Sequence, residues 1–122
     1  NWGTRAFDYK MIAKVIKSKN CASKLKPGDR YVFSAAGTLL PDQCTASLCL
    51  WALAPMLPFS YIVYSRLCEG LEPIITPNRV KCTDVGIECG GFGEVLFEMS
   101  CIKEPWSPED YLNIKYVVQK KR

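Results

Sequence analysis

Residues 43–65 contain no charged side chain in twenty-three consecutive positions, and this stretch constrains the fold more than any other feature. Leu, Ala and aromatic residues dominate this stretch. Its composition and its length together predict a central helix. We expect Asp42 to cap the N-terminus of this helix. Pro55 and Pro58 should kink the helix or split it into two segments, because proline removes a backbone donor and clashes with the preceding turn.

The predicted helix has no polar stripe, because apolar residues lie on both of its faces. A helix that is hydrophobic all round is buried on both sides, in protein or in lipid. The length reaches the roughly 20 residues of a membrane span, but the two prolines and the position between predicted strands argue against such a span. We therefore expect one face to pack on the domain's own sheet and the other to bind a larger protein subunit, through Leu50, Leu53, Leu57 and Tyr61.

Four short segments predict strands around this helix. In the first, Met11, Ala13 and Val15 share one side, which is the period-two pattern of a half-exposed strand. The predicted strands cover residues 9–17, 31–33, 79–82 and 94–101. The expected class is α+β: a small antiparallel sheet in the order strand, strand, helix, strand, strand, with one long apolar helix kinked by proline and a C-terminal helix or arm.

The 122 residues are enough for one domain with a hydrophobic core. We assign residues 1–104 to a single α+β domain and residues 105–122 to a C-terminal docking arm. Ser107 and Pro108 form a strong helix start in this arm. The arm is apolar, so we expect Tyr111 and Tyr116 to anchor it on a partner subunit.

The chain has seven cysteines and no histidine. Without histidine there is no Ser-His-Asp or Cys-His catalytic machinery, which excludes most familiar small-enzyme chemistries. An odd number of thiols argues against a closed set of disulfides and favours a reducing, cytoplasmic location. The chain as given also opens without a basic and then apolar leader, which favours the same location.

Basic residues concentrate in residues 1–40, which hold eight Lys or Arg against Asp8 and Asp29. Such a basic face attracts phosphates or a coenzyme tail. No aromatic residues interleave with the lysines, however, and no nucleic-acid-binding motif accompanies them, so we predict no nucleic-acid partner. The glycine-rich segment 90–93 leads into a strand rather than into a helix, so we interpret it as a hairpin loop and not as a phosphate-binding loop.

Three interpretations of the cysteines remain open. Cys44 lies at the expected N-terminus of the helix, where backbone N–H groups stabilise a thiolate, and it is the only catalytic candidate. Cys21, Cys44, Cys49 and Cys82 form the ligand set to test first for zinc or an iron–sulfur cluster. In the third interpretation most of the cysteines are small buried apolar residues.

Three segments of the chain form a recognisable set: a turn that runs from Cys21 to Gly28-Asp29, an apolar helix opened by Cys44 with a Leu-x-Pro step, and a last strand with Val95-Leu96-Phe97-Glu98. In these segments the chain resembles a family of small uncharacterised proteins common in anaerobic bacteria and archaea. The resemblance implies no activity. The chain departs from the family by lacking a histidine near Trp51 and by two additions, residues 86–93 and the tail, which suit added contact surfaces.

From these features we expect a non-catalytic accessory subunit of a larger anaerobic metabolic enzyme. It would dock through the apolar helix and the C-terminal arm. The alternative is a metal- or iron–sulfur-binding protein that transfers electrons or holds a cluster. A third hypothesis is a thiol enzyme that uses Cys44.

Overall fold

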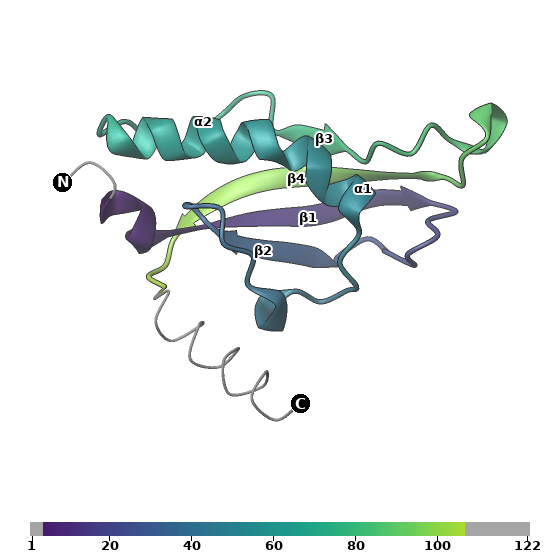
Figure 1. Cartoon of the computed structure of the whole chain (residues 1–122), viewed down its shortest axis with the longest axis horizontal. Helices are drawn as coiled ribbons and strands as arrows, with labels where there is room; N and C mark the ends of the chain where they lie inside the picture. Colours follow the sequence, from purple (N-terminus) through teal and green to yellow (C-terminus); the bar gives the residue numbers. More distant parts are fainter. Residues whose placement is uncertain (1–3, 107–122) are drawn as a thin grey trace.

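A computed structural model describes residues 4–106 of the chain. Its four strands form one antiparallel sheet in the order β2-β1-β4-β3, and the main helical segment lies along this sheet (Figure 1). The predicted α+β class is therefore confirmed. The strands are β1 (Tyr9–Lys19), β2 (Arg30–Ser34), β3 (Arg79–Lys81) and β4 (Glu94–Lys103). The helical elements are α1 (Leu50–Leu53), α2 (Leu57–Cys68) and the 3-10 turns η1 (Thr4–Asp8), η2 (Pro41–Gln43), η3 (Ala54–Met56) and η4 (Ile87–Cys89).

The two long strands β1 and β4 pair along almost their whole length and form the centre of the sheet. Ala13 lies opposite Met99, and Val15 lies opposite Phe97. All four side chains are buried, as the period-two pattern predicted. Side chains alternate between the two faces of a strand. This register therefore places the buried apolar side chains of β1 and β4 on the same face of the sheet.

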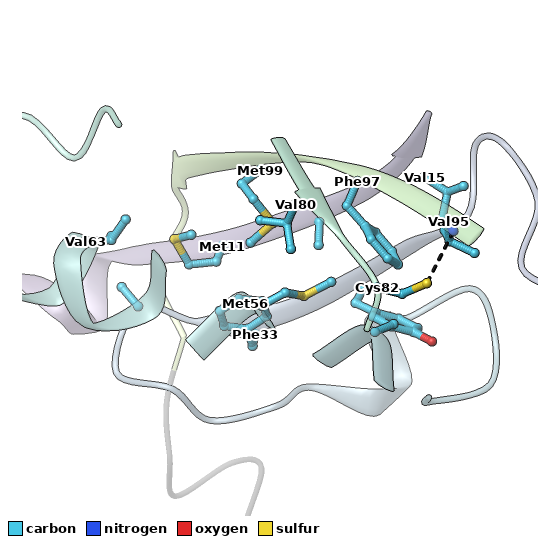
Figure 2. Packing of buried hydrophobic residues seen from close by; sticks show 14 of the residues in the cluster. Met11, Val15, Phe33, Met56, Val63, Val80, Cys82, Val95, Phe97 and Met99 are labelled. Carbon is cyan, nitrogen blue, oxygen red and sulfur yellow. Dashed lines mark hydrogen bonds between the residues drawn. The ribbon is translucent and has the colours of Figure 1, made fainter. Parts of the chain in front are cut away.

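The core forms where this face meets the helical segment. Figure 2 shows side chains of β1, β3 and β4 converging on Met56 of η3 and on Phe33 of β2. Beside them the rings of Tyr31 and Phe97 stack with their centroids 5.8 Å apart. Both aromatic side chains are fully buried. The core therefore depends on contacts between residues that are far apart in the sequence.

The helix begins at Leu50, so the prediction that it starts after Asp42 is wrong. Asp42 lies in η2, and Cys49, the residue before the helix, makes no side-chain capping bond. The intervening residues instead bond to the outer edge of β2. Thr45 donates its N–H to the Arg30 carbonyl and accepts the Arg30 N–H on its hydroxyl, at 3.0 and 2.8 Å. An unpaired strand edge has to satisfy its backbone groups, and residues 38–45 do this for β2.

The prolines split the helical segment as predicted. Pro55 lies in the 3-10 turn η3 between α1 and α2, and Pro58 lies in the first turn of α2, where a missing N–H is tolerated. Within residues 4–106, no helix has both the length and the apolar character that a membrane crossing requires.

After β4 the chain returns to the N-terminal turn η1. Trp106 donates its indole N–H to the Ala6 carbonyl at 2.9 Å, and its ring packs on Phe7 with centroids 5.2 Å apart. Trp106, assigned from the sequence to the arm, therefore contacts the domain. Residues 107–122, with Tyr111 and Tyr116, lie outside the described residues.

Candidate functional site

Three of the four cysteines chosen as metal ligands line one cavity of about 360 Å³. Cys21 lies in the loop after β1, Cys49 precedes α1, and Cys82 follows β3. The pairing of Lys19 with Glu94 holds the loop after β1 beside the start of β4. The Thr83 N–H bonds to the Trp51 carbonyl at 2.9 Å and holds the end of β3 against α1. Strand pairing thus collects thiols that are widely separated in the sequence.

The cavity is mostly apolar. Its inner wall includes the buried side chains of Leu25, Ala52 and Val95. The exposed part of its lining carries Leu48, Leu50, Trp51 and Phe92, which are 42 to 75% exposed. Large apolar side chains at the opening of an apolar cavity are typical of a place where another molecule binds.

Cys49 is held by the buried Tyr31. The Tyr31 hydroxyl donates to the Ser47 carbonyl at 2.6 Å and accepts the Cys49 N–H at 3.0 Å. Burial alone would raise the pKa of the Cys49 thiol, but the Ser23 hydroxyl and the backbone N–H groups of Ala52 and Trp51 outweigh it and lower that pKa. Hydrogen bonds to the charged form stabilise a thiolate in this way. The sequence reasoning missed Tyr31 and Ser23, because neither lies near Cys49 in the chain.

Cys44 lies apart from this cavity, beside the outer edge of β2. Its sulfur accepts the Val32 N–H at 3.3 Å, and its thiol lies 3.5 Å from the Leu40 carbonyl oxygen. Burial raises the pKa of this thiol. We expected the helix N-terminus to stabilise a thiolate at Cys44. The helix starts at Leu50, so Cys44 does not lie at its N-terminus. In the structure Cys44 therefore serves as a hydrogen-bond partner for a backbone N–H at the edge of β2.

The remaining thiols differ from Cys49 as well. Cys82 accepts the Val95 N–H on its sulfur at 3.3 Å, shown as the dashed line in Figure 2. Burial raises the pKa of Cys101 to about 11, and Cys89 is exposed on η4. In the described part of the chain, no group of three or more Cys, Asp or Glu side chains has an arrangement that holds a metal ion.

Asp84 organises the loop between β3 and β4, beside the cavity. Its buried carboxylate accepts backbone N–H groups from Gly86, Phe92 and Gly93 at 2.9 to 3.2 Å. These bonds, that of Gly86 first, lower the pKa of Asp84. The glycine-rich segment thus wraps around a carboxylate of its own chain, which agrees with the hairpin-loop interpretation. An aspartate two residues before a glycine is the sequence pattern that predicts such a turn.

We expect acid to destabilise the domain through this carboxylate. A carboxyl group whose pKa is lower in the folded state stabilises the fold above its ordinary value of 3.8, and the contribution is lost as the pH falls through the folded-state pKa. The pKa of Asp29 is also lowered, first by the Lys26 N–H. Urea unfolding at roughly pH 6 and pH 3 should show a smaller acid-induced loss for Asp84→Asn than for the wild type. Equal losses in both proteins would contradict this role.

The outward surface of the helical segment is the second candidate site. Leu50, Leu57, Tyr61 and Ile62, here called the helix outer face, are 75%, 57%, 69% and 47% exposed. Leu53, which we had predicted on this face, instead packs against the core. The inner side of the same segment supplies Ala52, Met56, Val63 and Leu67 to the core. The helical segment is therefore apolar on both sides but covered on only one.

Comparisons with protein-family models, with curated proteins and with solved structures found no match. The proposals below therefore depend on the geometry of the cavity and of the helix outer face.

Proposed function

We propose that the chain is a non-catalytic accessory subunit of a larger enzyme complex, and that the helix outer face binds the partner. The observation that carries this proposal is the exposure of Leu50, Leu57 and Tyr61, each more than half exposed on one apolar helical segment. Monomeric proteins rarely expose large contiguous apolar patches to water, and such patches are typical of interfaces between proteins.

The character of the face indicates the character of the partner. Residues 43–65 carry no charge, so the face offers no ion pair to a partner. Tyr61 adds an aromatic ring, a residue type that is frequent among the energetically dominant residues of interfaces. The helix outer face therefore fits a partner surface that is apolar and has no charged residue at its centre.

The test uses the tagged full chain, purified gently from its native source. We expect the wild type to elute in a stoichiometric complex with a larger protein, and Leu57→Asp combined with Tyr61→Asp to reduce that complex at least about tenfold, because a buried unpaired charge at the centre of an interface is costly. Size-exclusion chromatography with light scattering gives the mass of each complex, and mass spectrometry identifies the partner.

A matched control introduces the same charges elsewhere. Ile74 and Val85 are 69% and 65% exposed and lie outside the helical segment, so Ile74→Asp combined with Val85→Asp should leave the complex intact. A wild-type chain that elutes as a monomer under all gentle conditions would overturn the proposal. So would a complex that both double variants weaken equally. A complex made only of copies of this chain would contradict the larger partner and would show that the face binds a second copy of the chain.

A further inference from the structure

The cavity lined by Cys21, Cys49 and Cys82 shares only Leu50 with the helix outer face, and its features point to a ligand. Its volume of about 360 Å³ lies within the range of small-molecule sites. Its walls are mostly apolar, so they favour an apolar ligand over water. Exposed apolar side chains, among them Trp51 and Phe92, are part of its lining.

Cys49 is the group in the cavity that is suited to react. It is half-buried, so a ligand in the cavity reaches it, and its hydrogen bonds lower the pKa of its thiol, which raises the share of the nucleophilic thiolate. Of the other two thiols of the lining, Cys82 is buried and its sulfur is already bonded to the Val95 N–H. Cys21 is half-buried like Cys49, so its rate of modification is compared with that of Cys49 below. A thiolate in an apolar cavity is complementary to an apolar molecule with a soft electrophilic carbon.

The surroundings of Cys49 restrict the reaction further. The chain has no histidine, and the Asp84 carboxylate is occupied by three backbone N–H groups. Glu94, the other carboxylate of the lining, forms an ion pair with Lys81 at 3.9 Å. Among the described residues that line the cavity, each carboxylate therefore already has a partner. An addition reaction suits such a site, because it expels no leaving group that would need a proton.

We propose that this cavity binds a small apolar molecule that carries an α,β-unsaturated carbonyl group, and that Cys49 adds to it covalently. The thiolate lone pair forms a bond between Sγ and the β-carbon of the ligand. The π electrons of the carbon–carbon double bond shift toward the carbonyl group and give an enolate. Water then donates a proton to the α-carbon, which restores the carbonyl group and leaves hydroxide in the solvent. The product is a thioether on Cys49, with no oxidant or second reactant.

The experiment compares N-ethylmaleimide with N-hexylmaleimide, two conjugated carbonyl compounds that differ in the length of their apolar chain. The full chain is treated at neutral pH, and the rate of modification of each cysteine is measured by peptide mass spectrometry. We expect the hexyl compound to react with Cys49 at least about tenfold faster than the ethyl compound, because the cavity binds the longer chain. At the exposed Cys89, the internal control, the two rates should agree within about twofold.

A variant separates binding in the cavity from general thiol reactivity. The Phe92 side chain is 57% exposed on the lining, so Phe92→Ser should leave the fold intact. It should reduce the hexyl preference of Cys49 while changing the ethyl rate little. Equal ratios of the hexyl and ethyl rates at Cys49 and Cys89 would overturn the proposal, as would a Cys49 that neither compound modifies. Leu57 and Tyr61 do not line this cavity, so the result is independent of the docking test.

Discussion

Gly93→Ala should destabilise the domain by at least about 3 kcal/mol, the largest loss that we expect from adding a single methyl group. A Cβ atom at this position would overlap the carbonyl oxygens of Lys19 and Asn20. These are backbone atoms at the end of β1, so no side chain is free to move aside. The chain must separate where β4 begins, beside the Asp84 loop and the cavity. Urea unfolding followed by circular dichroism measures the loss.

The matched control for this variant is Gly70→Ala. A Cβ atom at Gly70 would meet nothing within 4 Å, although the backbone there has a φ of 76°. We expect a cost of only about 1 to 2 kcal/mol, which is the cost of holding alanine in the left-handed region. If the two variants lose equal stability, the close approach to β1 does not explain the presence of glycine at position 93.

Phe97→Ala should cost about 3 to 5 kcal/mol, the range for removing a large side chain from a closed core. The Phe97 side chain is fully buried on β4 (Figure 2). Its ring stacks on that of Tyr31. Tyr31 in turn accepts the Cys49 N–H, so the variant should also loosen the cavity. We expect a lower midpoint of urea unfolding and, in the folded protein, a smaller preference of Cys49 for the hexyl compound over the ethyl compound.

Ile102→Ala on the same strand is the control, because Ile102 is 37% exposed. Its removal should cost about 1 kcal/mol or less, and it should leave the reactivity of Cys49 unchanged. A similar loss for both variants would mean that the buried face of β4 does not dominate the stability of the domain.

The strands could be predicted because their pattern is local. Met11, Ala13 and Val15 lie at every second position of β1, and this spacing predicts that they share the side that faces the core. The break in the helical segment could also be predicted from the sequence. The ring of Pro55 disturbs a helix regardless of what the helix packs against.

The start of the helix could not be predicted from local pattern. Asp42 and Cys44 resemble a capping residue and the first turn of a helix, but Cys44 and Thr45 bond to the edge of β2 instead. Helix propensity is a weak preference that tertiary contacts override. The free-energy cost of leaving backbone groups unpaired at a strand edge is larger than this preference. Residues 38–45 can pair with those groups only when they lie beside β2 in the folded protein.

The sequence by itself determined the α+β class, the buried faces of β1 and β4, and the apolar character of the helical segment on both sides, because each depends on residue type and spacing along the chain. Only the tertiary structure decided that Cys49 and not Cys44 has the lowered pKa, that Cys21, Cys49 and Cys82 share one cavity, and that Asp84 holds the glycine-rich loop. The physical reason is that burial, hydrogen bonding and strand register act between residues far apart in the chain, and they exist only once β1 and β4 have paired.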